Sequence, residues 1–209
     1  LADHGMGVSL ILRGPGECQV GKVVDGMVSQ IDIFPTVCEL LDIDPPEWLQ
    51  GTSMMPLIRG HQTQIREETF AEVNYHAAYE PKRAVRTHRW KYIRHYGNRN
   101  LPVMTNCDDS ITKSVMIDYG WRERDISRER LYDILFDPSE ANNLANDPEY
   151  KNTLKDMRIR LDRWMKETDD PLVSNEIVPP DKDGMLNDPG DLSPPQDHQS
   201  PAKEMIHKS

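Results

Sequence analysis

A capped amphipathic stretch between Asp147 and Thr168 places the strongest constraint on the fold of this 209-residue chain. Asp147 is a typical helix N-cap, and Pro148 fits the first helical position. Because a helix with one apolar stripe must cover an apolar surface, the chain needs a sheet or another helix for it to pack on. The stripe recurs at helical spacing and consists of Leu154, Met157, Leu161, Trp164 and Met165.

Short β-type runs before this helix can supply that surface. They are TFAEV (69–73), RAVRT (83–87), WKYIRHY (90–96) and RLYDIL (130–135). The first three are joined by connections short enough for antiparallel neighbours. We therefore expect an α+β subdomain over residues 67–170, in which a small antiparallel sheet packs against one long helix. The polar region from 98 to 129 should contain one helix near Asp108–Met116 and has the length of a functional loop.

Residues 1–66 carry a different pattern. The run VSLIL (8–12), closed by RGPG, predicts a buried strand that ends in a turn. QGTSMMPLIRG (50–60) predicts a loop with one short helical turn. A buried strand needs further strands beside it, so we expect the end of an α/β core with an exposed apolar patch. Between the two segments a helix is predicted with Asp32 as N-cap, Pro35 in its first turn and an apolar face of Ile33, Val37, Leu40 and Leu41.

The segment 171–209 has a composition that disfavours a packed core. It contains no Phe, Tyr or Trp and seven of the sixteen prolines. Such a segment buries too little apolar surface to offset the entropy of ordering it. We expect an extended tail that is ordered only where it lies across the body of the protein or a partner subunit.

The net charge of -10 disfavours a general nucleic-acid binder, since phosphate-backbone affinity needs excess Lys and Arg. No stretch approaches the length of a membrane span, and the three cysteines lack a CxxC spacing. Residues 81–107 nevertheless form a basic island without Asp or Glu. It indicates either a local anionic ligand or pairing with acidic residues elsewhere. Its members are Lys82, Arg83, Arg86, Arg89, Lys91, Arg94 and Arg99.

Four blocks, in this order, resemble the C-terminal part of type I sulfatases of the alkaline phosphatase superfamily. They are LILRGPG, VSQIDIFPTVCELLDIDPPEWLQGTSMMPLIRG, RAVRTHRWKYIRHY and LYDILFDPSEANNLANDPEY. AEVNYHAAYEPKRAVRT and LDRWMKETDDPLV are most similar to the heparan N-sulfatase (sulfamidase) branch. The resemblance implies the last part of the α/β sulfatase fold followed by the C-terminal subdomain. It also implies hydrolysis of sulfate esters or sulfamates on glycosaminoglycan-type sugars, and a periplasmic, secreted or lysosomal location.

The family's chemistry uses a formylglycine nucleophile made from a Cys/Ser-x-Pro-x-Arg motif and a divalent cation, usually calcium. No Cys or Ser of this chain is followed by that pattern. We therefore expect residues 1–209 to be inactive alone, with no catalytic residue and no cofactor of their own. The nucleophile and the calcium would belong to a missing N-terminal sulfatase domain, and a homo-oligomer is compatible with the sequence.

Asp3-His4-Gly5 looks like the family's Asp-His-Gly metal motif. In the family, however, a longer stretch with a sulfate-contacting Lys separates that motif from the strand, and here only Met6 and Gly7 precede Val8. We expect no metal binding by Asp3 or His4. The resemblance instead makes His76 and Arg83 the candidate substrate-binding residues. His76 falls where sulfamidase-like enzymes carry a His over the active-site mouth, and both side chains suit an anionic sugar.

Two alternative functions remain open from the sequence. The first is a non-catalytic module that binds sulfated glycans through the basic island, in which case Arg83→Ala and Lys91→Ala should weaken heparin retention. The second is a phosphatase or phosphodiesterase of the same superfamily. Asp133 and Asp137 are interpreted as turn and cap residues rather than a catalytic pair.

Overall fold

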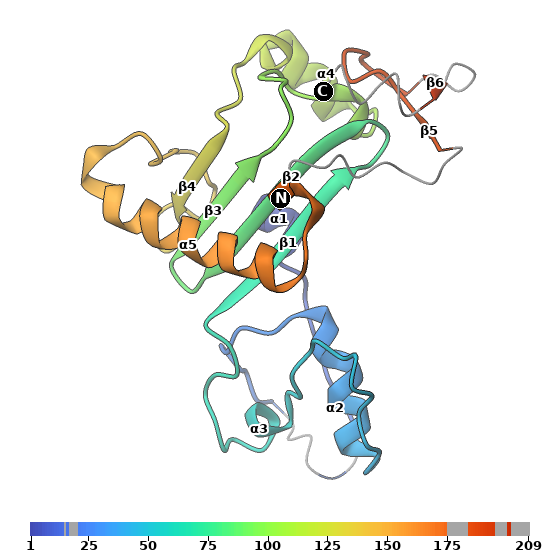
Figure 1. Ribbon diagram of the computed structural model, residues 1–209, viewed down its shortest axis with the longest axis vertical. Helices are drawn as coiled ribbons and strands as arrows, with labels where there is room; N and C mark the ends of the chain where they lie inside the picture. Colours follow the sequence, from blue (N-terminus) through green and yellow to red (C-terminus); the bar gives the residue numbers. More distant parts are fainter. Residues whose placement is uncertain (15, 17–20, 175–183, 195–199, 202–209) are drawn as a thin grey trace.

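The computed structural model describes residues 1–209 except 15, 17–20, 175–183, 195–199 and 202–209. A four-stranded sheet crossed by one long helix occupies its centre (Figure 1). Helices α2 (Ile33–Leu40) and α3 (Met55–Ile58) lie beyond one end of the sheet, and α4 (Ile111–Asp118) lies beyond the other. None of the described helices is long and apolar enough to cross a membrane.

The sheet is an antiparallel meander with the order β1-β2-β3-β4. Each predicted strand run is confirmed, because alternating β-branched and aromatic residues form a half-buried ribbon here as they do elsewhere. Glu68 pairs with Thr87, Arg83 with Arg94 and Ile93 with Arg130. The strands are β1 (Glu68–Tyr75), β2 (Tyr79–Thr87), β3 (Trp90–His95) and β4 (Glu129–Asp133).

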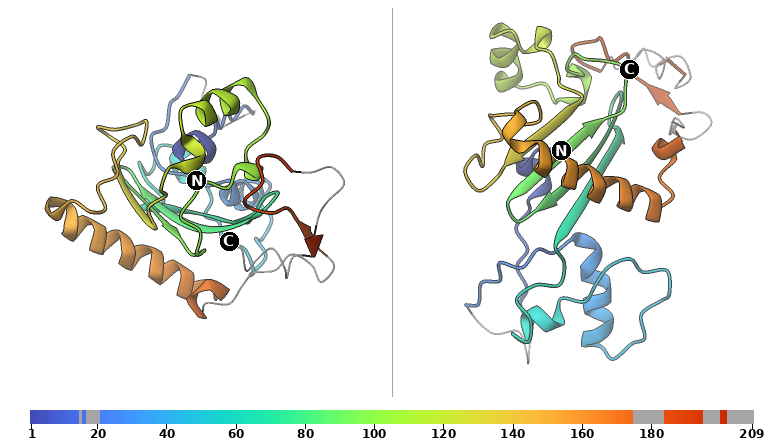
Figure 2. Two further views of the ribbon diagram at one scale, coloured as in Figure 1. Left: turned by 90° about the horizontal axis from the view of Figure 1, so that it is seen from above. Right: turned by 60° about the vertical axis from the view of Figure 1, so that its left-hand side comes forward.

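Helix α5 (Lys151–Glu167) covers one face of this sheet (Figure 2). Asp147 accepts a hydrogen bond from the Glu149 amide at 2.9 Å and so acts as a cap, but of the 3₁₀ turn Pro148–Tyr150 that runs directly into α5. The ring of Trp164 stacks on Phe70 with 4.9 Å between centroids. The predicted stripe is confirmed as the core between helix and sheet, where it meets Val85, Tyr92 and Leu131.

The opposite face of the sheet carries a second, smaller core. It consists of Ala84, Ile93, Tyr132 and Ile134. Leu1 and Met6 pack against it from either side of the short helix α1 (Asp3–Met6). The first residues of the chain therefore help to bury this side of the C-terminal sheet.

The predicted strand Val8–Leu12 is wrong. These residues form no strand, and all of their side chains are exposed, Ile11 at 87%. A strand exists only when a neighbour takes up its backbone hydrogen bonds, and none of the described strands pairs with this segment. The run keeps the apolar composition of a buried strand without the sheet that would bury it.

Helix α2 also differs from the prediction, although its position is right. The predicted apolar face is exposed, and the helix buries Pro35, Thr36 and Cys38 instead. The expected exposed apolar side chains are thus present, and they lie on two segments of the N-terminal region. They are Val8, Leu10, Ile11, Leu12, Ile33, Phe34, Val37, Leu40 and Leu41.

Asp32 is not an N-cap of the ordinary kind. It ends a 3₁₀ turn (Gln30–Asp32) and is fully buried, with no cap hydrogen bond to α2. Its carboxylate accepts from the amides of Ser29 (2.7 Å) and Thr52 (2.8 Å) and pairs with Arg66. Asp32 therefore joins three segments of the N-terminal region rather than one helix end.

The loop after α2 returns along that helix. Gly51 allows a close approach, because a Cβ there would lie 2.0 Å from the Ile31 carbonyl oxygen. The predicted helical turn is confirmed as α3. Helix α4 begins later than predicted because Ser110 caps it, accepting from the Lys113 amide at 3.1 Å.

Part of the predicted tail lies on the body of the protein. Leu186, in the short strand β5 (Met185–Leu186), and the neighbouring Asn187 are buried. Strand β5 pairs with β6 (Ser200–Pro201). Most of the tail lies outside the described residues, so the prediction for it stays untested.

Candidate functional site

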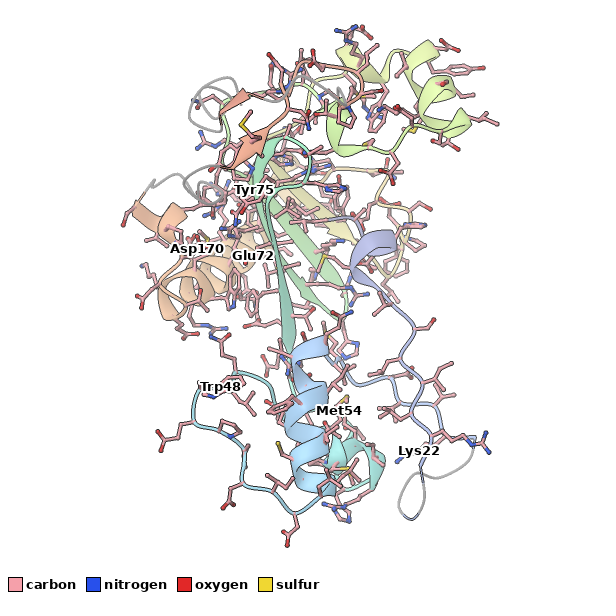
Figure 3. All side chains as sticks on the ribbon, turned by 90° about the vertical axis from the view of Figure 1, so that its right-hand side faces the viewer. Lys22, Trp48, Met54, Glu72, Tyr75 and Asp170 are labelled. Carbon is pink, nitrogen blue, oxygen red and sulfur yellow. The ribbon has the colours of Figure 1, made fainter. Side chains whose placement is uncertain are left out.

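The β1–β2 hairpin ends in a tight tip that carries His76, the predicted substrate-binding histidine. His76 is exposed, and its amide donates to the Ala78 carbonyl at 3.3 Å. Tyr75 precedes it at the upper end of β1 (Figure 3) and is also exposed. Ala78 and Tyr79 are buried directly behind the tip, so its base is fixed while two ring side chains face outward.

Two asparagine side chains fasten this tip from outside the hairpin. Asn106 accepts from the amides of Ala77 (2.9 Å) and Ala78 (2.8 Å) and donates to the Ala78 carbonyl (3.1 Å). Asn187, from the tail, donates to the Ala77 carbonyl through its amide and its side chain, both at 3.0 Å. The conformation of the His76 tip is therefore set by the 98–129 region and by the tail.

We expect Asn106→Ala to loosen the hairpin tip without unfolding the chain. The change leaves two backbone amides without acceptors, which costs about 1–3 kcal/mol. Hydrogen exchange should show the peptide spanning residues 75–79 exchanging at least about 5-fold faster. Asn100→Ala, which removes one exposed bond to Asp125, is the matched control. Unchanged exchange at 75–79 in the Asn106 variant would contradict the clamp.

Arg83 does not join His76 at this tip. It is 1% exposed, and its guanidinium forms a bidentate ion pair with Asp170, Nε–Oδ2 at 2.5 Å and Nη2–Oδ1 at 3.1 Å. Its Nη1 donates to the carbonyls of Val73 and Lys82. Figure 3 shows Asp170 beside Glu72 of β1. Because every nitrogen of Arg83 is engaged inside the protein, we assign it a structural role and not a direct substrate contact.

The basic island is mostly neutralised within the fold. Six of its seven members form ion pairs with carboxylates, and Lys91 is fully buried between Asp3 (3.0 Å) and Glu140 (2.9 Å). The interpretation that these cations pair with acidic residues outside the island is therefore confirmed for six of the seven. A glycan-binding surface built on Arg83 and Lys91 is not supported, since neither side chain reaches the surface.

Asp3 belongs to the same network of ion pairs. Its carboxylate accepts from Arg86 (3.0 Å) and Lys91 (3.0 Å). Burial by itself would raise the pKa of Asp3, but the hydrogen bonds and charges of these two cations outweigh it and lower the pKa. A carboxylate held between two cations does not fit a calcium ion, and the described residues contain no cluster of three or more metal-ligating side chains.

Asp133 and Asp137 take the structural roles predicted for them. Asp133 ends β4 and pairs with Arg89 at 2.7 Å. Asp137 accepts from the amides of Ala141 (3.1 Å) and Asn142 (2.8 Å), which closes the turn after the strand. The Asp133 carbonyl also accepts from the amides of Phe136 (3.1 Å) and Asp137 (2.7 Å), so both residues help to form the turn after β4.

A cleft of about 410 Å³ lies on the sheet face opposite α5, between the strands and the 98–129 region. Lys82, Arg124, Arg130 and Trp121 line it. Asn106 lines it too, so the cleft adjoins the clamped tip. Arg124, Arg130 and Trp121 were not predicted from the sequence. Alternation along β4 could have indicated Arg130, because it places this residue on the face away from α5, opposite Leu131.

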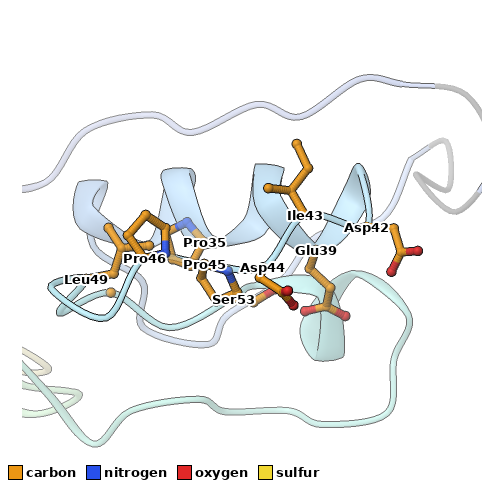
Figure 4. A pocket seen from close by; sticks show the side chains of 10 residues that line it. Pro35, Glu39, Asp42, Ile43, Asp44, Pro45, Pro46, Leu49 and Ser53 are labelled. Atoms are coloured by element: carbon orange, nitrogen blue, oxygen red, sulfur yellow. The ribbon is translucent and has the colours of Figure 1, made fainter.

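A second hollow, of about 440 Å³, lies between α2 and the loop that follows it (Figure 4). Its lining is proline and carboxylate, including Glu39, Asp42 and Asp44. Glu39 is neutralised by Arg59 at 2.5 Å. An acidic surface repels sulfate, so this hollow does not suit the anionic ligand that His76 suits.

Comparison with known proteins decides the family. Residues 1–110 match the family model described as "N-sulphoglucosamine sulphohydrolase, C-terminal". The chain belongs to this family. The predicted sulfatase family is thereby confirmed over more than half of the chain.

Two curated relatives and one solved structure extend the match. A "Delta 4,5-hexuronate-2-O-sulfatase" of Bacteroides thetaiotaomicron is 32% identical over 84% of this chain and 32% of its own length. The human N-sulphoglucosamine sulphohydrolase is 27% identical over 73% of this chain and 35% of its own. The structure of a "2-O GAG sulfatase" aligns with TM-score 0.51 and 27% identity, over 70% of this chain and 26% of that one. The fold is that of the sulfatases, and the chain spans about a third of the length of the curated relatives that it matches.

Proposed function

We propose that this chain is the C-terminal portion of a sulfatase that hydrolyses sulfate esters or sulfamates on glycosaminoglycan-type sugars, in the manner of heparan N-sulfatases. The family match over residues 1–110 carries the proposal. The relatives named for sulfated uronate and sulphoglucosamine chemistry support the substrate class.

The chemistry would come from a preceding sulfatase domain. The chain itself lacks a Cys/Ser-x-Pro-x-Arg motif, so it has no residue for conversion to formylglycine. The calcium would also be held by that domain, since Asp3 is already paired with Arg86 and Lys91. The exposed apolar side chains on residues 8–12 and α2 fit packing against that domain.

Within this arrangement the chain contributes substrate recognition. His76 stands exposed on a hairpin tip that two asparagines hold in one conformation. A preorganised histidine loses little entropy on binding, and it can donate a hydrogen bond to an anionic group. We therefore retain His76 as the proposed substrate contact, with Arg83 supporting the strand that carries the tip.

The activity test compares two proteins. Purified 1–209, supplied with calcium and an aryl sulfate, should show no turnover. The same chain joined to a sulfatase N-terminal domain that carries the nucleophile motif should hydrolyse N-sulfoglucosamine or 2-O-sulfated uronate substrates. A Cys→Ala change in that motif is the control and should abolish turnover. Turnover by 1–209 alone would contradict the proposal that the nucleophile belongs to a preceding domain.

His76→Ala in the joined protein tests recognition separately. We expect KM to rise about 10-fold or more on the sulfated sugar, because one charge-assisted hydrogen bond is lost. A small aryl sulfate, which does not reach the tip, should be hydrolysed normally. The phosphatase alternative makes the opposite prediction for the joined protein, namely turnover of phosphate monoesters in preference to sulfates.

A further inference from the structure

The cleft opposite α5 has charges that the fold leaves uncompensated. Lys82 pairs with Glu80 at 2.7 Å, whereas Arg124 and Arg130 form no ion pair with a carboxylate of the described residues. The carboxylates at the cleft have partners of their own. Glu140 pairs with Lys91, and Asp125 accepts from Asn100. Two guanidinium groups therefore supply net positive charge to a hollow of ligand size.

Arg130 is the residue of the cleft whose hydrogen bonds the described fold leaves incomplete. Its Nε is buried and has no hydrogen-bond partner among the described residues. Its Nη2 donates to Nε2 of His95 at 2.6 Å. That bond fixes the guanidinium plane from behind. A buried donor without an acceptor costs stability, and such groups commonly mark sites for water, ions or ligands.

Trp121 supplies the other half of a sugar site. It lies in the 3₁₀ turn Trp121–Glu123 and lines the cleft with its side chain half-buried. An indole offers a flat apolar surface for the C–H face of a sugar ring, while neighbouring polar groups take the substituents. Asn106 lines this cleft and also holds the His76 tip, so the cleft adjoins the tip.

We infer that this cleft binds a sulfated sugar unit, with its sulfate on Arg130 and Arg124 and its ring on Trp121. The substrate class rests on the proposed function, but the binding itself does not require the catalytic domain. Guanidinium groups bind sulfate oxygens through paired, charge-assisted hydrogen bonds.

Calorimetric titration of 1–209 with a heparin disaccharide containing N-sulfoglucosamine tests the inference. We expect binding that weakens about 10-fold or more in Arg130→Gln and Arg124→Gln and several-fold in Trp121→Ala. Arg122→Gln is the matched control, because this exposed neighbour does not line the cleft. Arg124 is exposed and tolerates replacement, so the test does not depend on the Arg130 variant folding.

The N-acetylated disaccharide and inorganic sulfate identify the group that is recognised. The N-acetylated probe should bind about 10-fold more weakly, and inorganic sulfate should compete only at much higher concentration. Equal affinity of the wild type and the Arg124 and Arg130 variants, or no binding at millimolar disaccharide, would overturn the inference. The same variants are also made in the joined protein. If they lose disaccharide binding but still hydrolyse an aryl sulfate normally, binding in this cleft is distinguished from the proposed catalytic activity.

Discussion

Asp170→Ala should lower the free energy of unfolding by about 3–5 kcal/mol, because it leaves the Arg83 guanidinium buried without a counter-charge. The side chains of the two partners are 1% and 3% exposed. Asp170 also accepts from the Leu172 amide at 3.0 Å, so the change opens the connection after α5 as well. Denaturant unfolding followed by circular dichroism measures the loss as a lower midpoint with unchanged slope.

Two further variants distinguish the stability contributed by the buried ion pair from that of an ordinary surface ion pair. Asp156→Ala removes one partner of Arg160 on the exposed side of α5, while Arg160 keeps its pair with Glu68, and the change should cost no more than about 0.5 kcal/mol. Arg83→Met combined with Asp170→Leu should recover a large part of the single-variant loss, since no buried charge then lacks a partner. If Asp170→Ala cost no more than Asp156→Ala, the buried pair would have no structural role, and Arg83 would again be a candidate substrate contact.

The sequence predicted the C-terminal subdomain well because its signals are local. Strand alternation in 69–96 and helical spacing in 154–165 are repeated several times over, and each repeat points to the same face. Asp147 next to Pro148 marks the start of the 3₁₀ turn that leads into the helix. These patterns involve only near neighbours in the chain, so they can be recognised before any tertiary partner is known.

The misjudged features depend on partners far away in the chain. Arg83 looked like a free cation because Asp170 is 87 positions away. Asp32 was predicted to be a helix cap, because nothing near it in the sequence shows that its Oδ1 accepts from the Thr52 amide twenty positions later. Val8–Leu12 looked like a buried strand because its composition is that of one, while the sheet is absent among the described residues. Local patterns identify charged or apolar residues that need a partner, but the partner that the fold supplies determines the role of each residue.

His95 should make the stability of the chain depend on pH above the range where its carboxylates titrate. Burial, together with the charges of Arg130 and Lys82, lowers the pKa of His95 from 6.5 to about 3. The unfolded chain therefore binds a proton near pH 6.5 and the folded chain only near pH 3, so acidification across this window favours unfolding. One such proton changes the free energy of unfolding by up to about 1.4 kcal/mol per pH unit.

His95→Gln keeps an acceptor for Arg130 and removes the titrating ring. Between pH 4.5 and 6.5 the slope of unfolding free energy against pH should fall by about one proton relative to wild type. Asp3 and Glu129 do not obscure this result, because their folded pKa values lie below 3.8 and 4.5. His88→Gln, in the exposed β2–β3 turn, is the matched control and should keep the wild-type slope. An unchanged slope in the His95 variant would mean that the ring is protonated in the folded state. In that case it could not accept from Arg130, and the support that holds this guanidinium in the cleft would be lost.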